Sequence, residues 1–225
     1  GSEMCIRDSK NEVAKHMDEL SPAARIIGAV NTIVNEDGKL VGHITDGIGF
    51  VRNLKEHGVD VKGKKMVVLG AGGAATAIQV QCALDGAREI SIFNIKDAFF
   101  ERTLQTAEKI RKAVPECVVN VYDIADTAKM TEEIQSSDIF ANATIVGMKP
   151  MDDQSVVKDL SAFRPGLVVA DAVYNPEETK LLREAKEAGC TCVRGKGMLL
   201  WQGVAAFKLY TGQDLSLIHI SEPTR

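Results

Sequence analysis

The chain has no strong excess of charge of either sign, and this already excludes several classes of partner. Its 225 residues include 27 basic and 31 acidic side chains, a formal net charge of −4. Without a basic stripe, nucleic acid is a poor candidate partner. No apolar run approaches the roughly 18 residues that a membrane-spanning helix needs, so we expect no membrane contact. The first residues show no secretory signal pattern, and we therefore expect a cytoplasmic protein.

Cysteine is also scarce, and its spacing fits no metal site. The chain contains Cys5, Cys82, Cys117, Cys190 and Cys192. These intervals match no zinc or redox motif, so we predict no bound metal and a protein whose thiols are reduced. Cys190 and Cys192 would share one face of a strand, where packing is the simpler explanation. There are no low-complexity segments and no repeats of 20–50 residues.

A glycine-rich turn between a strand and a helix organises the rest of the chain. Residues 66–69 (MVVL) form a short apolar run, typical of a strand buried on both faces of a parallel sheet. Residues 70–75 (GAGGAA) then fit G-x-G-x-x-A, and a helix-length segment follows as far as residue 84. Gly70 allows the tight turn, and Gly72 lets the backbone approach a pyrophosphate. The helix start offers N–H groups and the positive end of its dipole to the phosphates.

A polar cluster lies where such a unit reads the ribose of a dinucleotide. Residues 89–93 predict the next strand, and Asn94, Lys96 and Asp97 follow it. Asn94 comes 24 residues after Gly70 (94 − 70), near the ~20 expected for a ribose-binding side chain. Strand, glycine turn, helix, strand and polar cluster together predict a dinucleotide-binding unit.

Strands and helices alternate through most of the chain. After the glycine turn we expect helices near 98–113, 129–136, 177–188 and 198–210, with strands at 117–122, 138–143, 167–173 and 191–194. Before it we expect a helix over 10–20, a short helix capped by Ser21-Pro22, and a hairpin of 28–34 with 40–44 around an Asp-Gly turn. A further helix runs from Asp46 to about residue 57. This pattern predicts an α/β protein with a doubly wound parallel sheet.

Several polar residues stand where packing explains them poorly. Asn31 interrupts an apolar strand, Asp46 opens a helix, and Gln202 lies on an apolar helix. Asn142 and Thr144 end a strand, where doubly wound sheets bind ligands. Plainer explanations exist: Asp46 could be a helix N-cap, and the amides could be satisfied within the core.

These segments together resemble one family. GAVNTIV, TDG, VVLGAGGAATAI, NATIVGMKP, DAVYNPEETKLLREAKEAGC and GMLLWQG resemble the shikimate dehydrogenases, over residues 10–214. FNIKDAFF and GMLLWQG are most similar to the quinate/shikimate dehydrogenase branch. The resemblance implies a Rossmann NAD(P)-binding domain beside an α/β substrate domain. It also implies reversible reduction of 3-dehydroshikimate to shikimate, or of 3-dehydroquinate to quinate, in aromatic amino-acid biosynthesis or quinate metabolism.

The resemblance assigns roles to individual residues. It makes Lys10 and Asp46 the catalytic pair, which fits a reaction that must move a proton while hydride reaches a ketone. From the sequence alone, Lys10 would be read as an exposed lysine. The resemblance makes Asn31, Gln202 and Tyr174 substrate-binding residues. It implies these cofactor contacts: Gly70, Ala71, Gly72, Gly73, Ala74, Asn94, Lys96, Asp97, Thr144, Gly197 and Met198.

The cofactor prediction favours NAD, with NADP possible. Ile95 stands where family members commonly carry an arginine, and a guanidinium fork is the better clamp for a 2′-phosphate. Lys96 retains one positive charge, and Asp97 could accept a hydrogen bond from a free ribose hydroxyl.

Departures from the family set the expected domains. The family has a longer segment before the catalytic lysine, with a Ser-x-Ser pair, and Asp8-Ser9 replace Pro-Asn here. Ile44 also replaces the usual Asn before Thr45. We expect a substrate-domain remnant at 1–45, a dinucleotide domain at 46–195 and a returning helix at 196–214, with 1–9 and 215–225 foreign to the family. A monomer or homodimer is expected.

Two alternatives stay open. The chain could be a fragment that binds NAD and catalyses nothing. It could also be a different Rossmann enzyme, such as a methylenetetrahydrofolate dehydrogenase. Asp46, Gln202 and Tyr174 occurring together argue against the second alternative.

Overall fold

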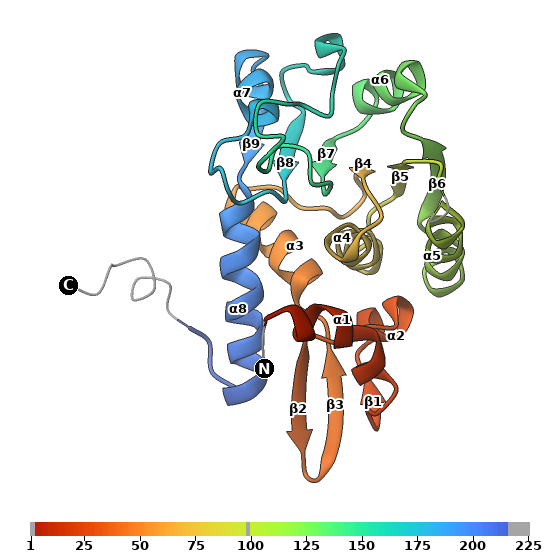
Figure 1. The fold of residues 1–225 in the computed structure, drawn as a ribbon, viewed down its shortest axis with the longest axis vertical. Coiled ribbons are helices and arrows are strands. Elements are labelled where there is room, and N and C mark those ends of the chain that lie inside the picture. Colours follow the sequence, from red (N-terminus) through yellow and green to blue (C-terminus); the bar gives the residue numbers. More distant parts are fainter. Residues whose placement is uncertain (1–2, 98–99, 216–225) are drawn as a thin grey trace, which may run out of the picture.

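The computed structural model describes residues 3–97 and 100–215 and contains two sheets (Figure 1). The larger sheet lies in the upper half of the view and the smaller one in the lower half, with α8 (Gly195–Thr211) running along both. No helix in these residues is long and apolar enough to cross a membrane. Of the ends expected to be foreign, 1–9 and 215–225, residues 1–2 and 216–225 lie outside the described residues.

The larger sheet has six parallel strands in the order β6-β5-β4-β7-β8-β9. The strands are β4 (Lys65–Leu69), β5 (Glu89–Asn94), β6 (Val118–Asp123), β7 (Ile139–Asn142), β8 (Val168–Asp171) and β9 (Thr191–Val193). Within this sheet the chain passes first through β4, then through β5 and β6 on one side of it, and then crosses to β7 on the other side. The order therefore reverses between β4 and β7, the place where doubly wound sheets bind nucleotides. The predicted fold class is confirmed.

Helices cover both faces of this sheet (Figure 1). One face carries α3 (Asp46–Glu56), α4 (Gly73–Leu84) and α5 (Phe100–Ala113), and the other carries α6 (Thr127–Gln135), the short helix η1 (Leu160–Ala162) and α7 (Lys180–Glu187). The first two residues of the helix expected over 98–113 lie outside the described residues.

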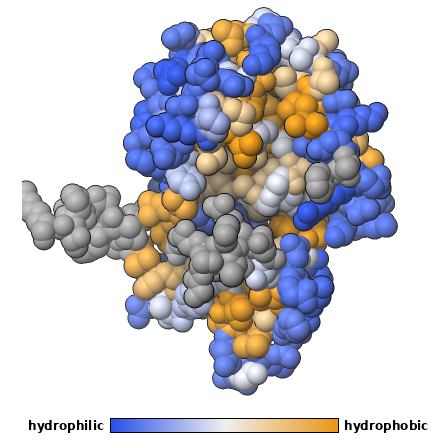
Figure 2. Space-filling model, in the orientation of Figure 1, coloured by the Kyte–Doolittle hydropathy of each residue, from blue (hydrophilic) through white to orange (hydrophobic). Residues whose placement is uncertain are grey.

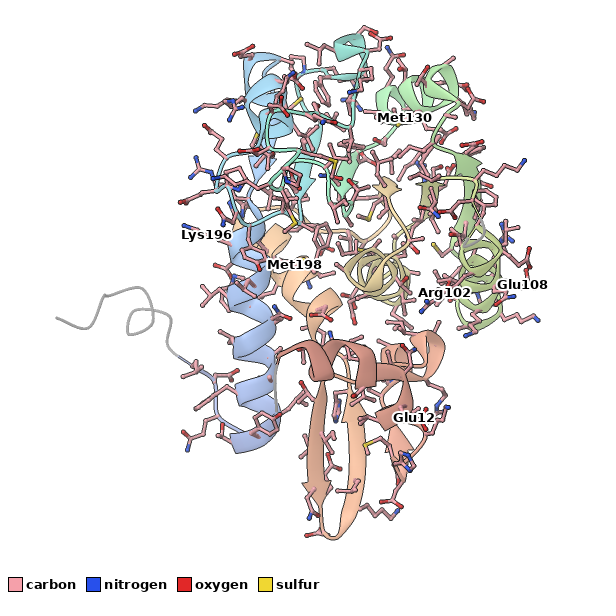
Figure 3. The ribbon with its side chains drawn as sticks, in the orientation of Figure 1. Glu12, Arg102, Glu108, Met130, Lys196 and Met198 are labelled. Carbon is pink, nitrogen blue, oxygen red and sulfur yellow. The ribbon has the colours of Figure 1, made fainter. Side chains whose placement is uncertain are left out.

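Alternating side chains of β4 pack into the two hydrophobic cores. Met66 and Val68 belong to one buried cluster, and Val67 and Leu69 belong to the other. The two clusters lie on opposite sides of the sheet, which is why this strand is apolar throughout. Met130 by α6 and Met198 on α8 mark the two sides in Figure 3.

The smaller sheet has three strands in the order β1-β3-β2. β2 (Thr32–Glu36) and β3 (Lys39–His43) form the predicted hairpin. Its turn residues Asp37 and Gly38 have φ of 51° and 90°. A two-residue hairpin turn of this twist requires positive φ at both positions, which Asp-Gly tolerates well.

Two predicted boundaries in this half are wrong. The helix expected over 10–20 is α1 (Glu3–Ala14), and the chain then forms β1 (Glu19–Leu20) parallel to β3. The Asp18 N–H donates to the carbonyl of Leu40 at 2.9 Å, and the Asp18 carboxylate accepts the Leu40 N–H at 2.7 Å. Pairing with β3 therefore satisfies the backbone that a longer helix would have used.

The strand expected over 28–34 begins only at Thr32. Gly28 has a φ of 73° and ends the preceding helix α2 (Pro22–Ile27), donating its N–H to the carbonyl of Ala24 at 2.8 Å. A left-handed glycine is the common end of a helix, so the glycine belongs to α2 rather than to the hairpin. The predicted cap of α2 is confirmed, because the Ser21 side chain accepts the Ala24 N–H.

Hydrophobic surface gathers over the hairpin end of the molecule and along α8 (Figure 2). The exposed large apolar side chains there include Ile33 and Leu40 on the hairpin and Leu199, Leu200 and Tyr210 on α8. Within the described residues β2 pairs only with β3, so its other edge is open. In folded proteins an unpaired strand edge beside exposed apolar side chains is ordinarily covered by another segment or by a partner.

A buried charge network ties α6 to the start of the larger sheet. The Glu133 carboxylate is 2.8 Å from Lys65 Nζ and 2.8 Å from Lys129 Nζ, and it accepts a hydrogen bond from Ser91 Oγ at 2.7 Å. Burial would raise the pKa of Glu133, but the hydrogen bonds from Lys129, Lys65 and Ser91 outweigh it and lower that pKa to about 2.

This network predicts a loss of stability in acid. A carboxyl whose folded pKa lies below its unfolded value stabilises the fold above the unfolded pKa, and the contribution disappears as pH falls through the folded pKa. For Glu133 the window runs from about 4.5 down to about 2. Glu133→Gln should remove on the order of 2–3 kcal/mol at neutral pH and much less near the bottom of that window.

Urea unfolding at several pH values measures this effect. Glu132→Gln is the matched control, because Glu132 is the exposed neighbour that pairs with the same Lys129 at 3.1 Å. Exposed pairs contribute little, so Glu132→Gln should follow the wild type throughout. A Glu133→Gln deficit that stays constant with pH would contradict the prediction.

Candidate active site

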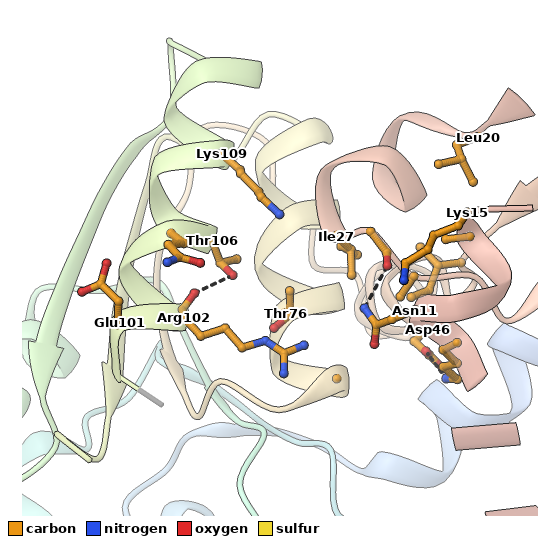
Figure 4. Close-up of a pocket in the computed structure, with 17 residues that line it drawn as sticks. Asn11, Lys15, Leu20, Ile27, Asp46, Thr76, Glu101, Arg102, Thr106 and Lys109 are labelled. Atoms are coloured by element: carbon orange, nitrogen blue, oxygen red, sulfur yellow. Dashed lines mark hydrogen bonds and ion pairs between the residues drawn. The ribbon is translucent and has the colours of Figure 1, made fainter. Parts of the chain in front are cut away.

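A cavity of about 850 Å³ separates the two halves of the molecule. Lys10 and Asp46 line one side of it, Gly73 and Thr76 of α4 line the other, and α5 closes one end. Figure 4 shows these side chains converging from α1, α3, α4 and α5. Residues from both halves of the chain therefore meet in one space, as in most ligand sites between domains.

Lys10 and Asp46 form an ion pair in this cavity. Lys10 Nζ lies 3.2 Å from Asp46 Oδ2, and the two side chains are 29% and 16% exposed. The carbonyl of Lys10 accepts the N–H of Val30 at 3.0 Å, which ties α1 to the connection between α2 and β2. Asp46 is the first helical residue of α3 and Thr45 occupies the N-cap position, so capping does not explain the carboxylate.

Asn31 is hydrogen-bonded to Thr45, the residue before Asp46, but it is not among the residues that line the cavity. Its Oδ1 accepts the backbone N–H of Thr45 at 3.0 Å and the hydroxyl of Thr32 at 3.0 Å. Within the described chain its Nδ2 donates no hydrogen bond. The oxygen end is thus fixed against the start of α3, and the amide can offer a ligand two N–H donors.

The glycine turn is open to the cavity at the start of α4. Gly70 has a φ of 104°, and a Cβ there would lie 2.9 Å from the carbonyl of Ala143. The buried Gln79 donates to the Gly70 carbonyl at 3.0 Å. By contrast Gly72 and Gly73 are exposed, and a Cβ on either would meet nothing within 4 Å.

This geometry fits the diphosphate of a dinucleotide. Ala71 and Ala74 complete the exposed turn, and the small Ala75 behind it is fully buried. Bare backbone N–H groups at a helix start bind phosphate well, and no side chain obstructs them here. Thr144 adjoins the turn, because its Cγ2 would lie 3.3 Å from a Cβ on Gly70.

The predicted ribose-binding cluster lies at the end of β5, away from the cavity wall. Asn94 donates from Nδ2 to Thr103 Oγ1 at 3.1 Å, which fixes the start of α5 beside the strand end. Lys96 and Asp97 are exposed, and Ile95 between the two halves of the cluster is 60% exposed. None of these residues lines the cavity.

Four further predicted residues lie outside the cavity lining, around α8. Tyr174 is 42% exposed on the loop after β8, and Met198 is buried in the core. Gln202 is partly exposed and lies on the turn of α8 that crosses Gly49. A Cβ on Gly197 would clash with the Asn53 side chain, so close helix packing is sufficient reason for that glycine.

One wall of the cavity was not predicted from the sequence. Arg102, Gln105, Thr106 and Lys109 line it from one face of α5, and Thr76 faces them from α4. Figure 4 shows Arg102 reaching toward Thr76 and Lys109 directed into the cavity. The signal was the spacing of polar residues at i, i+3, i+4 and i+7, which also describes an ordinary solvated helix face.

Comparisons with known proteins decide the family. No model of a known protein family matches the sequence. A quinate/shikimate dehydrogenase of Escherichia coli O139:H28 is 49% identical over 214 residues, which cover 95% of this chain and 74% of that protein. The chain belongs to the quinate/shikimate dehydrogenase family.

Solved structures agree with this assignment. Shikimate 5-dehydrogenase from Listeria monocytogenes, in complex with shikimate and NAD, matches with a TM-score of 0.91 at 50% identity, covering 94% of this chain and 73% of that one. A shikimate dehydrogenase in complex with NADP+ matches with a TM-score of 0.79 at 37% identity, covering 93% and 70%. As a member of this family, the chain is an NAD(P)-dependent oxidoreductase of the shikimate dehydrogenase type.

Proposed function

We propose that the chain catalyses the reversible NAD(P)-dependent oxidation of shikimate to 3-dehydroshikimate, of quinate to 3-dehydroquinate, or of both. The observation that carries the proposal is the Lys10–Asp46 pair, 3.2 Å apart on the cavity that the glycine turn also lines. An acid/base pair and a phosphate-binding turn around one cavity are what a nicotinamide-dependent alcohol oxidation needs.

In this proposal Lys10 moves the proton. Hydride transfer is the chemistry that a bound nicotinamide supplies, and the alcohol must lose its hydroxyl proton as hydride leaves the carbon. Lys10 accepts this proton in oxidation and donates it to the developing alkoxide in reduction. The Asp46 carboxylate stabilises the protonated lysine and holds its Nζ in place.

Amides then select the substrate. The Asn31 N–H donors, fixed by the bonds that its Oδ1 accepts from Thr45 and Thr32, are proposed to bind a ring hydroxyl. Gln202 and Tyr174 are proposed to contact the substrate from α8 and from the loop after β8. A substrate that lacks the matching hydroxyl would leave such groups unpaired, which is a strong basis for discrimination.

A turnover assay tests the proposal. We expect NADH or NADPH to form when the protein is mixed with shikimate or quinate and the oxidised cofactor. An alternative is a protein that binds NAD without turnover. The unpaired edge of β2 supports this alternative, because β2 belongs to the half of the molecule proposed to bind the substrate. A substrate site that does not form there would leave the NAD site on the larger sheet intact. Calorimetric binding of NAD with no product from either substrate would favour this alternative and sink the proposed activity.

The proposed cofactor preference is NAD over NADP. Lys96 is the basic side chain of the cluster after β5, and the exposed Ile95 contributes no charge for a 2′-phosphate. Ile95→Arg should therefore raise kcat/KM for NADP by roughly tenfold, because a guanidinium binds phosphate with two hydrogen bonds. Steady-state kinetics with each cofactor measures the change.

Val118→Arg is the control for added charge. Val118 is 54% exposed at the start of β6, the opposite end of the sheet from the glycine turn. It should leave the ratio of NADP to NAD activity unchanged. A wild-type chain that uses NADP as well as NAD would show the proposed preference to be wrong.

A further inference from the structure

A buried carboxylate at the end of β8 has no part in the site as described so far. Asp171 is 2% exposed. Its Oδ1 accepts Asn142 Nδ2 at 3.0 Å and the N–H of Val173 at 2.9 Å, while its Oδ2 accepts the hydroxyl of Thr179 at 2.6 Å. All three partners donate, so the ionised carboxylate is the form that satisfies them.

Asn142 transmits this arrangement to the next loop. It is fully buried, and its Nδ2 also donates to the carbonyl of Val146 at 3.1 Å. Its Oδ1 accepts both the N–H of Thr144 at 3.1 Å and the Thr144 hydroxyl at 2.8 Å. Rotating the amide by half a turn would set its oxygen against Asp171, so the carboxylate fixes which end faces Thr144.

The network joins two loops that follow neighbouring strands. Asn142 and Asp171 are direct partners in the β7–β8 register. Thr144 is on the loop after β7, beside Gly70, and Tyr174 is on the loop after β8. Thr179, which caps α7, also approaches the first loop, since a Cβ on Gly147 would lie 3.2 Å from its Cγ2.

The charge is a poor choice for stability alone. Burial raises the pKa of Asp171 from 3.8 to about 6, although the bonds from Thr179, Val173 and Asn142 oppose the shift. A carboxyl with a raised folded pKa stabilises the fold fully only below its unfolded pKa, and that contribution is lost as pH rises to about 6. At neutral pH the ionised Asp171 therefore stabilises the fold less than its protonated form would, so stability alone does not account for a carboxylate at this position.

We propose that Asp171 is a positioning residue that, through Asn142, holds the Thr144 loop and the Tyr174 loop in fixed register beside the glycine turn. The proposal rests on the proposed function for the roles of Thr144 and Tyr174. Asp171 itself contacts neither the cavity nor the glycine turn. Its effect on turnover passes through the backbone and hydroxyl of Thr144.

Amide hydrogen exchange without cofactor is the first test. In Asp171→Ala we expect the amides of Thr144 and Val146 to exchange roughly tenfold faster or more, because the Asn142 amide loses the partner that orients it. If Asp171 had only a local packing role, exchange would become faster at the Val173 amide alone, and that result would overturn the proposal. If Asp171→Ala fails to fold, Thr179→Val is the second variant: it removes the Oδ2 donor and also the cap that Thr179 provides to the Leu182 N–H of α7. It should speed exchange at the Thr144 amide less than Asp171→Ala but in the same direction, and faster exchange confined to the start of α7 would overturn the proposal.

Kinetics is the second test, with a matched control. Asp171→Ala should lower kcat about tenfold, and Asp171→Asn should recover most of it, since its carbonyl can still accept from Asn142 and Val173. Ser91→Ala breaks another fully buried hydrogen bond of the same sheet, 2.7 Å long, and should leave kcat unchanged. Equal kcat losses in Asp171→Ala and Ser91→Ala would count against positioning. Absence of wild-type turnover would defeat the proposed function alone, and the exchange test would still decide the role of Asp171.

Discussion

Lys10→Ala should lower kcat for shikimate or quinate oxidation by about 10²–10⁴, the usual contribution of a positioned acid/base group. The change removes the ammonium 3.2 Å from Asp46 and leaves the cavity without the group proposed to carry the proton. Binding of NAD should persist, because the ion pair that Lys10 makes is with Asp46 and the glycine turn stays unchanged. Steady-state kinetics and calorimetric titration with NAD measure the two effects separately.

Lys39→Ala is the control for this variant. Lys39 is also a lysine of the small-sheet half in an ion pair, 2.9 Å from Glu19, but its side chain is 66% exposed. Exposed pairs contribute at most about 1 kcal/mol, so activity should be unchanged. If Lys10→Ala kept the activity of Lys39→Ala, another group would have to move the proton.

Gly49→Ala should destabilise the protein by about 1–3 kcal/mol and weaken substrate binding. A Cβ on Gly49 would lie 2.6 Å from both the Gln202 N and the Met198 carbonyl oxygen. Those atoms are backbone of α8, so no side chain can move aside and the two helices must separate. Asp46 begins α3 and Gln202 lies on α8, so the separation should also raise KM for the substrate. Urea unfolding and kinetics are the measurements.

Gly203→Ala is the matched control on the same pair of helices. Gly203 is exposed on α8, and a Cβ there would meet nothing within 4 Å. Alanine is the better helix former, so this change should stabilise the protein by up to about 1 kcal/mol with no change in KM. A second contact also joins α3 to α8: the Arg52 guanidinium lies 4.8 Å from the centre of the Trp201 ring. Equal stability of the two alanine variants would mean that α3 and α8 are not held this closely.

Local chemistry made most of the large sheet predictable. An apolar run such as residues 66–69 is buried on both faces wherever it occurs in a parallel sheet, and a glycine at Gly70 permits the positive φ that the turn requires. Asp37-Gly38 likewise predicts its hairpin, because both residues tolerate the left-handed region. These signals act over a few neighbouring residues and need no knowledge of the rest of the fold.

The wrong helix boundary lies where a segment distant in the sequence forms backbone hydrogen bonds with residues that local spacing assigns to a helix. Val13, Met17 and Leu20 recur at helical spacing, yet Glu19-Leu20 pairs with β3, a segment more than twenty residues later in the sequence. The apolar spacing does not distinguish the two arrangements, since Met17 and Leu20 pack against the core in the observed one as a helix would also require. Only the position of β3 selects the strand.

For this protein, the sequence by itself determined the doubly wound class, the glycine turn and the family, because these depend on local conformational preference and on the order of motifs. The family resemblance paired Lys10 with Asp46, and the tertiary structure gave the 3.2 Å contact between them. Tertiary structure alone decided that α5 supplies a wall of the cavity and that Asp171 is linked to Thr144 through Asn142. Each of these contacts joins residues far apart in the chain. Their geometry follows from how helices and strands pack, which no local pattern encodes.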